Sequence, residues 1–393
     1  MAAQADWIEA ELHQLRERGL ERQIREYPQA GGILRIGNRR FINFSSNDYL
    51  ALARNPEVTA AAEAALRRWG AGSGASRLVS GSLPCHEELE RRLATYKGYP
   101  AALVFGSGYM ANIGIIPAIL DRHDWIITDR RAHASIMDAA LLSRAVLHRF
   151  QHNDAAHLDA ILAKKPHDVK CLIVTESVFS MDGDLAPLKE IAAVARRHAA
   201  MLMVDEAHAT GIFGPGGAGL VRAGCLEDDV VLNMGTLSKA LGGYGGFVAC
   251  ADIWRQFIVN RARPLIFSTS LPPSVIGSVL GALRCIEAQP ALGVSLLNRA
   301  AHFREKLQAA GFQTGGSASQ IIPLIGGDNH KTLRWSQRLK EHGILAVAIR
   351  PPTVPPGTAR LRLSVTLDHS PEDLDHAADI LVQDARKEGV LNC

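Results

Sequence analysis

Short apolar runs alternate with longer stretches rich in alanine and leucine between about residues 56 and 289. Most of these runs are apolar throughout, many of their residues are β-branched, and several are separated by a stretch with helical spacing. Such strands are typical of parallel sheets that helices cover on both faces. The predicted strands are residues 102–105, 125–128, 145–147, 171–175, 201–204, 230–232 and 246–249. The pattern therefore predicts a large α/β domain with a mostly parallel sheet.

The flanking segments have different patterns. Apolar residues at helical spacing over 7–27 predict an amphipathic N-terminal helix that ends near Pro28. A smaller α+β domain is predicted after Pro290. The expected elements outside the large domain are strands over 33–36 and 40–44, a helix over 295–310, strands over 320–324 and 344–348, and a helix that begins after Ser370. The expected division of the chain is 1–55, 56–289 and 290–393.

Composition narrows the class of protein. The chain has 393 residues, 47% of them hydrophobic and 21% charged, which is ordinary for a globular enzyme with room for a buried site. A net charge of +3 with interspersed signs argues against nucleic acid as the main partner. Six cysteines occur singly, so free thiols in a reducing compartment and no structural metal site are expected. No signal peptide and no membrane-spanning run is recognised, which predicts a cytoplasmic protein.

One lysine, Lys239, lies between an apolar strand-like run and a glycine cluster at 242–246. A lysine that holds a carbonyl cofactor needs a lowered pKa, which burial and neighbouring cations supply. Apolar residues on both sides of Lys239 could provide that burial. On this segment alone, an ordinary surface lysine at a turn is the better interpretation.

Polar residues at the ends of other predicted strands change that balance, because open α/β sheets bind ligands at that edge. Asp205 ends one strand, and His208 follows three residues later. A carboxylate at such a position can keep a pyridine nitrogen protonated. The alternatives are a helix cap for Asp205 and a core histidine for His208. Two further strand ends offer Glu176 with Ser180, and His133. As isolated residues, Ser180 and His133 would more often be capping groups.

The segment Phe105 to Asn112 places small residues after a strand and before a helix, where backbone N–H groups can bind a phosphate. It also matches the G-x-G-x-x-A form of a dinucleotide fingerprint, so a nicotinamide oxidoreductase is a second interpretation. That interpretation leaves Lys239, Asp205 and His208 unexplained. A non-enzymatic cofactor-binding protein is a third.

Taken together, Asp205-x-x-His208 and Thr236-x-Ser-Lys239 resemble the signature of the α-oxoamine synthase family, which are fold type I enzymes dependent on pyridoxal 5'-phosphate (PLP). The resemblance extends over most of the chain through the segments 44–50, 74–77, 180–184 and 350–363. It implies a fold type I transferase with a PLP-binding large domain.

The resemblance also implies roles for individual residues. Lys239 would hold the cofactor covalently, and Asp205 would pair with its ring nitrogen. The other implied cofactor contacts are a hydrogen bond from His208 to the ring oxygen, stacking of His133 on the ring, backbone contacts of Gly108 and Tyr109 to the phosphate, and polar contacts of Ser180 and Thr236.

The resemblance also implies residues that bind the two substrates. The amino-acid carboxylate would be bound by Asn47 and by one of Arg350 or Arg362. The acyl substrate would be contacted by Thr353 and by one of Arg22 or Arg25.

The implied activity is a decarboxylative condensation of an amino acid with an acyl thioester. The segment 349–355 favours the branch of biotin synthesis that joins L-alanine to a pimeloyl group carried by coenzyme A or acyl carrier protein. Another member activity, such as glycine C-acetyltransfer, is the alternative within the family. The family also implies a homodimer, which leaves open whether Asn47 and residues 267–269 serve their own subunit's site or the partner's.

Overall fold

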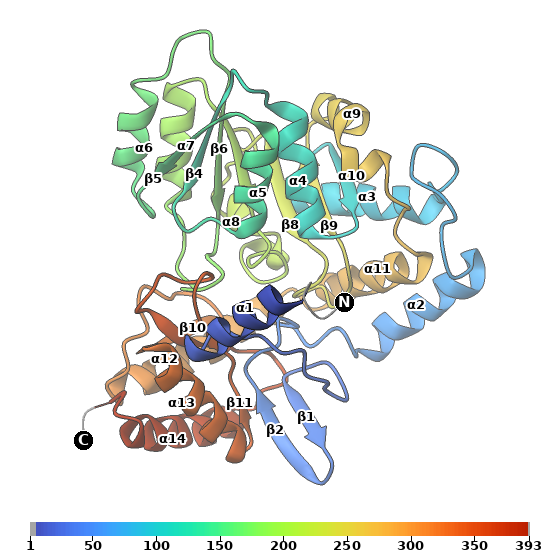
Figure 1. The fold of residues 1–393 in the computed structure, drawn as a ribbon. Coiled ribbons are helices and arrows are strands. Elements are labelled where there is room, and N and C mark those ends of the chain that lie inside the picture. Colours follow the sequence, from blue (N-terminus) through green and yellow to red (C-terminus); the bar gives the residue numbers. More distant parts are fainter. Residues whose placement is uncertain (1–4, 392–393) are drawn as a thin grey trace. The chain divides into compact units, whose positions relative to one another are not determined.

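The computed structural model describes residues 5–391, which form two units (Figure 1). The larger unit consists of residues 50–180 and 185–295. The smaller one consists of the chain up to residue 49, residues 181–184 and the chain from residue 296. The sequence pattern treats the N-terminal segment and the C-terminal domain as separate parts. In the structure, the chain up to residue 49 and the chain from residue 296 belong to the same unit.

A seven-stranded sheet forms the centre of the larger unit, in the order β3-β9-β8-β7-β6-β4-β5. Neighbouring strands are parallel except at β9, which is antiparallel to both β3 and β8. The strands are β3 (Ala101–Phe105), β4 (Trp125–Asp129), β5 (Val146–Phe150), β6 (Cys171–Glu176), β7 (Met201–Asp205), β8 (Leu232–Thr236) and β9 (Gly246–Cys250). The predicted mostly parallel sheet is confirmed, although β8 begins and ends later than the apolar run that predicts it.

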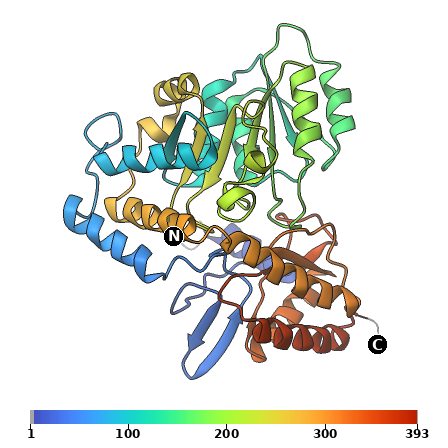
Figure 2. The same ribbon diagram turned by 180° about the vertical axis from the view of Figure 1, so that it is seen from behind.

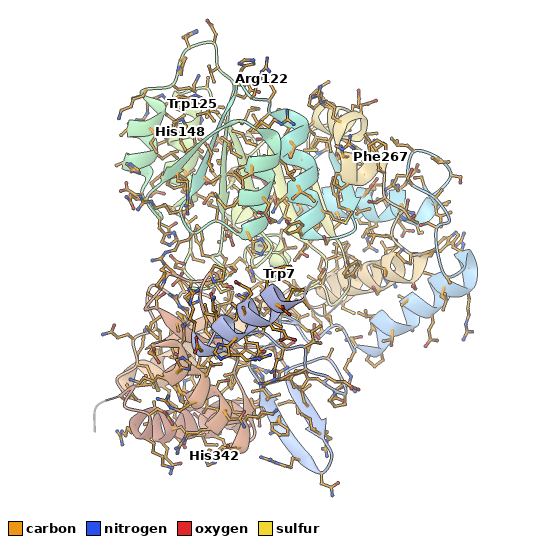
Figure 3. The ribbon with its side chains drawn as sticks, in the orientation of Figure 1. Trp7, Arg122, Trp125, His148, Phe267 and His342 are labelled. Carbon is orange, nitrogen blue, oxygen red and sulfur yellow. The ribbon has the colours of Figure 1, made fainter. Side chains whose placement is uncertain are left out.

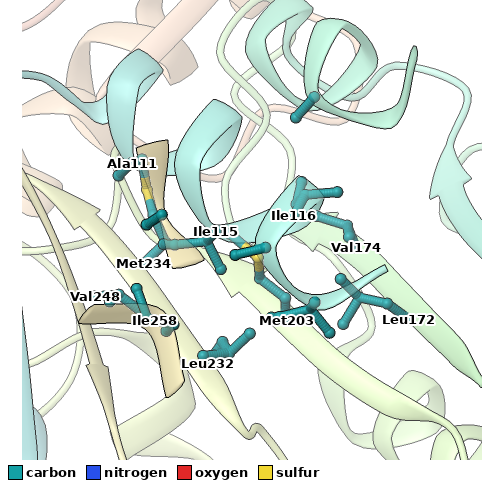
Figure 4. Close-up of a cluster of buried hydrophobic side chains, with 14 of the residues drawn as sticks. Ala111, Ile115, Ile116, Leu172, Val174, Met203, Leu232, Met234, Val248 and Ile258 are labelled. Carbon is teal, nitrogen blue, oxygen red and sulfur yellow. The ribbon is translucent and has the colours of Figure 1, made fainter. Parts of the chain in front are cut away.

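Alternate residues of the same strands pack into two different cores. Ile126 lies in one buried cluster, and its neighbour Ile127 lies in the other. The first cluster, which includes Ile115, Leu172 and Met203, lies between the sheet and helix α4 (Gly108–Ile119) (Figure 4). Because successive side chains of a strand point to opposite faces, an uninterrupted apolar run needs cover on both sides. The prediction of a sheet buried on both faces is therefore confirmed.

Helices of the larger unit provide this cover. Side chains of α4, α5, α9 and α10 line the first cluster, and those of α6, α7 and α8 line the second. Two further helices, α2 and α11, pack side by side, as both ribbon views show (Figures 1 and 2). The helices are α2 (Pro56–Trp69), α3 (Pro84–Lys97), α4 (Gly108–Ile119), α5 (Ala134–Ser143), α6 (Ala155–Leu162), α7 (Leu188–Arg197), α8 (Leu220–Ala223), α9 (Asp252–Arg261), α10 (Arg263–Ile266) and α11 (Pro273–Ala288), with a 3-10 turn over Pro215–Gly217.

The edge strand β5 is only partly buried. There the rings of Trp125 on β4 and His148 on β5 lie 4.0 Å apart between centroids (Figure 3). An aromatic contact of this kind stabilises the pairing of neighbouring strands.

The smaller unit contains two three-stranded sheets, ordered β1-β2-β11 and β10-β13-β12. Its strands are β1 (Ile33–Ile36), β2 (Arg39–Asn43), β10 (Ile321–Gly327), β11 (Ile344–Leu345), β12 (Ala348–Ile349) and β13 (Ala359–Ser364). Its helices are α1 (Asp6–Glu17), α13 (Asn329–Glu341) and α14 (Pro371–Lys387), and α12 (Leu292–Ala309) leads into it. Ser370 caps α14 together with Asp373, in agreement with the helix predicted after Ser370.

Two predictions for the smaller unit are wrong in detail. The N-terminal helix ends at Glu17 and not near Pro28, because Gly19 takes a left-handed conformation with φ of 61°. The N–H groups of Gly19 and Leu20 donate to the carbonyls of Arg16 and Leu15, which is a Schellman ending. Beyond it, Leu20 is only partly buried and Ile24 and Tyr27 are exposed, so little burial is available to extend the helix.

The strand predicted over 344–348 is also two elements. β11 pairs with β2, whereas β12 pairs with β13 in the other sheet. The chain therefore changes sheets between Leu345 and Ala348, which a continuous apolar run does not reveal.

Five cysteines lie among the described residues and none of them forms a disulfide; Cys393 lies outside the described part of the chain. Within residues 5–391, no single helix is both long and apolar enough to cross a membrane.

Candidate active site

Three strands of the larger unit end with polar residues at the same edge of the sheet. The register pairs Glu176 of β6 with Asp205 of β7, and Asp205 in turn pairs with Met234 of parallel β8, which ends two residues later at Thr236. Asp205 is 5% exposed, and its carboxylate accepts hydrogen bonds from the Asn112 amide at 3.0 Å and from the backbone N–H of Ala207 at 2.9 Å. Two donors hold this carboxylate in one orientation at the strand end.

Lys239 lies beside His208. The Lys239 Nζ atom is 2.8 Å from His208 Nε2, and the histidine is buried while the lysine is half-buried. The loop that carries Lys239 folds back on β8, since Thr236 Oγ1 donates to the carbonyl of Gly245 at 2.9 Å and the N–H of Leu237 does so at the same distance. The amine is thus held within hydrogen-bond distance of an imidazole.

His133 joins the same polar group through its neighbours. Its Nδ1 atom lies 2.8 Å from Ser135 Oγ, which accepts a hydrogen bond from the Asn112 amide at 2.9 Å. The same amide donates to Asp205, so a continuous chain of hydrogen bonds runs from His133 to Asp205. Desolvation lowers the pKa of His133, and the Lys239 ammonium adds to this effect while Asp205 opposes it. A neutral imidazole suits a residue expected to stack on a ring.

Gly108 and Tyr109 form the first turn of α4, whose N-terminus Ser107 caps by accepting from the N–H of Met110. N–H groups in a first helical turn lack acceptors within the helix and favour anions. A Cβ atom on Gly108 would lie 2.9 Å from Met234 Cε, so a larger residue there would require the end of this methionine side chain to shift. The Tyr109 hydroxyl donates to Asp138 at 2.6 Å, which leaves the backbone of Tyr109 for the predicted phosphate contact.

The larger unit thus brings together most residues predicted for a PLP site. An amine, a buried carboxylate and a helix N-terminus match the carbonyl, the ring nitrogen and the phosphate of that cofactor. Ser180 is buried and Thr236 lies at the end of β8. Sequence reasoning missed Asn112 and Ser135 as functional residues, because only the fold brings them next to Asp205 and His133.

A buried ion pair involves Glu206, the residue that follows Asp205. Lys97 and Glu206 are both fully buried, with Nζ and Oε2 2.5 Å apart. Glu206 also accepts from Asn233 and from the N–H groups of Leu220 and Val221. Its carboxylate therefore ties the turn between Asp205 and His208 to α3, α8 and β8. No sequence motif indicates this pair.

The predicted carboxylate-binding residues of the smaller unit form a separate group. Arg362 donates to Asn47 Oδ1 at 3.1 Å, to Ser364 Oγ at 2.8 Å and to the Tyr49 hydroxyl at 3.1 Å. Desolvation raises the pKa of Tyr49, against the opposing charge of Arg362. The phenol therefore stays neutral. Arg360, on the same strand, binds Asp182 instead.

Arg350 belongs to a different group. Its guanidinium donates to the backbone carbonyls of Gly19 and Glu21, at 2.5 and 3.3 Å. Desolvation lowers the pKa of Arg350, and the nearby charges of Arg22 and Arg25 add to that effect. Arg350 and Arg25 line one cavity of about 440 Å³ in this unit. Arg22 and Arg25, the two candidates for contact with the acyl substrate, thus lie near Arg350, whereas Arg362 lies with Asn47. Thr353 is exposed, and its N–H donates to the carbonyl of Arg350.

The family model of class I and II aminotransferases matches residues 39–381. The chain therefore belongs to this family, and it is a fold type I enzyme that depends on PLP. In sequence it is similar to the 8-amino-7-oxononanoate synthase of Geobacter sulfurreducens, with 46% identity over 98% of this chain and 99% of that protein. The protein of the same name from Anaeromyxobacter dehalogenans is also 46% identical, over 94% of this chain and 93% of its own length.

Solved structures show the same fold. A serine palmitoyltransferase from S. paucimobilis superposes with a TM-score of 0.93 at 33% identity, and the match covers all of both chains. An 8-amino-7-oxononanoate synthase from Francisella tularensis matches with a TM-score of 0.77 at 27% identity, over 89% of this chain and 99% of that one.

We expect Lys97→Met to destabilise the protein by about 3–5 kcal/mol, because it leaves the Glu206 charge buried without its cation. Lys97→Met combined with Glu206→Gln should recover a large part of that loss, since the neutral amide keeps most of the hydrogen bonds. Urea unfolding of the two variants and the wild type measures the difference. A single variant within about 1 kcal/mol of the wild type would show that the pair contributes little.

Proposed function

We propose that this chain catalyses the PLP-dependent condensation of L-alanine with a pimeloyl thioester, which yields 8-amino-7-oxononanoate, carbon dioxide and the free thiol for biotin synthesis. The observation that carries the proposal is the set formed by Lys239, His208 and Asp205 at one sheet edge. Near-complete similarity to proteins named 8-amino-7-oxononanoate synthase selects the reaction within the family. The proposed assembly is a homodimer in the cytoplasm.

In the proposed mechanism, bound PLP supplies an electron sink for negative charge at the substrate α-carbon. Asp205 keeps the ring nitrogen protonated, because an adjacent carboxylate favours the cationic form. Lys239 removes the α-proton with its free amine, and His208 holds that amine in place through the 2.8 Å contact. His133, oriented through Ser135, would stack on the ring of the bound cofactor.

The carbon–carbon bond then forms between the α-carbon of alanine and the thioester carbonyl, and the thiol leaves. The resulting β-keto acid loses carbon dioxide, and a proton returns to the same carbon. Arg362 and Asn47 bind the amino-acid carboxylate until it departs, since a guanidinium and an amide suit that group. Arg350 holds the segment that carries Arg22 and Arg25, the residues proposed for the acyl chain.

A second candidate is the condensation of L-serine with a long-chain acyl thioester, the reaction that the name serine palmitoyltransferase indicates. The TM-score of 0.93 to that enzyme favours it. Identity of 46% to the synthases against 33% to the palmitoyltransferase favours the pimeloyl reaction.

The proposed function is tested by thiol release from pimeloyl and palmitoyl thioesters of coenzyme A and of acyl carrier protein, with alanine, glycine and serine. We expect release with alanine and pimeloyl thioester, none with Lys239→Ala, and full activity with Lys189→Ala, an exposed lysine on α7. Preference for serine and palmitoyl thioester would establish the second candidate. No release with any pair would overturn both.

Replacement of Arg362 or Arg350 by lysine should change the KM of a different substrate in each case. Arg362→Lys is expected to raise KM for alanine about tenfold or more, because a lysine cannot replace the fork of donors shared by Asn47 and the substrate. KM for the thioester should change little. Arg350→Lys should do the reverse, since it loosens the segment before Arg22. Steady-state kinetics with each substrate varied in turn measures both effects. If either variant changed both KM values equally, the assignment of alanine to Arg362 and of the thioester to the Arg350 group would be refuted.

A further inference from the structure

Glu176 occupies a position that the proposed mechanism does not use. It is the last residue of β6, it is 3% exposed, and the register sets it beside Asp205. One of its carboxyl oxygens accepts the backbone N–H of His133 at 2.7 Å. The residue therefore links the carboxylate proposed for the ring nitrogen to the residue proposed to stack on the ring.

Three charged groups act on Glu176, two from the neighbouring strands β4 and β7 and one from the loop after β8. Asp205 at the end of β7 and Asp129 at the end of β4 are both acidic, and Lys239 after β8 is the basic group. Asp129 is itself engaged with His152 and with the N–H groups of Arg131 and Asn153. The sheet register sets Glu176 beside Asp205, and both residues are buried. A charged Glu176 would therefore be a second buried anion next to that carboxylate, which the charge of Lys239 offsets only in part.

Burial also favours the protonated form of Glu176. Desolvation raises the pKa of Glu176 well above its usual range, and Asp205 raises it further, against a weaker opposing effect of Lys239. A protonated carboxyl group still offers an acceptor to the N–H of His133 and carries its proton on the other oxygen. The hydrogen bond to His133 is thus compatible with the neutral form.

We propose that Glu176 is a positioning residue that the protein keeps as a neutral carboxylic acid. In this form it anchors His133 at the start of α5 and leaves Asp205 as the ionised carboxylate next to the ring nitrogen. The part of the proposal that concerns the cofactor rests on the proposed function. The protonation of Glu176 does not.

The first test is infrared spectroscopy of the holoenzyme at pH 7. We expect the band of a protonated carboxyl group that shifts in deuterium oxide and is missing from Glu176→Gln. If the wild type and Glu176→Gln have identical spectra in that region, Glu176 is ionised and the proposal is wrong. This result does not depend on which substrates the enzyme uses.

The second test is a pH titration of the visible absorbance of the bound cofactor. A neutral Glu176 predicts the same midpoint in Glu176→Gln as in the wild type. An ionised Glu176 predicts a lower midpoint in the variant by about 1 unit or more, since a nearby anion that stabilises a cation has been removed. The latter outcome would overturn the proposal.

Kinetics of two variants separate positioning from packing. We expect Glu176→Gln to keep kcat/KM within about twofold, because the amide oxygen still accepts the N–H of His133. Glu176→Ala should lower kcat/KM about tenfold or more, since it leaves that N–H without its acceptor. A Gln variant as impaired as the Ala variant would show that the acid itself is required and would contradict a merely positioning role. Should thiol release fail for the wild type as well, the infrared and absorbance results still stand.

Discussion

The Asp205 carboxylate at the end of β7 is the group on which the rest of the larger unit depends. A buried carboxylate is costly unless hydrogen bonds satisfy it, and here Asn112 and the N–H of Ala207 do so. The parallel pairing of β6, β7 and β8 sets Glu176 and the lysine loop beside it. Because the sheet is covered by helices on both faces, its strand ends are the place where polar groups can gather.

Surrounding residues stabilise this arrangement from two sides. The Lys97–Glu206 pair fixes the turn that leads from Asp205 to His208. A second set of hydrogen bonds, from Asn112 through Ser135, fixes His133. Few of these contacts touch the proposed reacting atoms, yet each limits how far a reacting group can move. The smaller unit contains two separate arginine groups, one around Arg362 and one around Arg350.

Much of the fold could be predicted from the sequence, because apolar runs of strand length report burial on both faces. The runs that became β3 to β9 were all found, and Ser370 correctly marked the start of α14. The end of α1 was missed because Gly19 stops the helix while the apolar spacing continues. The break between β11 and β12 was missed because both halves are apolar, although they belong to different sheets.

Some residues of the candidate site could likewise be predicted from the sequence, and others could not. Lys239, Asp205 and His208 could be named because they follow strands within short motifs. Asn112, Ser135 and Lys97 could not, since their partners are far away in sequence and only the register of the sheet brings them together. Arg350 and Arg362 were equivalent in sequence, and only their different hydrogen-bond partners distinguish them.

Nitrogen-15 NMR of holoenzyme reconstituted with labelled PLP tests most directly whether Asp205 controls the charge of the ring nitrogen. The expected result at neutral pH is a protonated ring nitrogen in the wild type and an unprotonated one in Asp205→Asn, while both bind the cofactor. An unprotonated nitrogen in the wild type, or a nitrogen that stays protonated in the variant, would contradict the role assigned to this carboxylate.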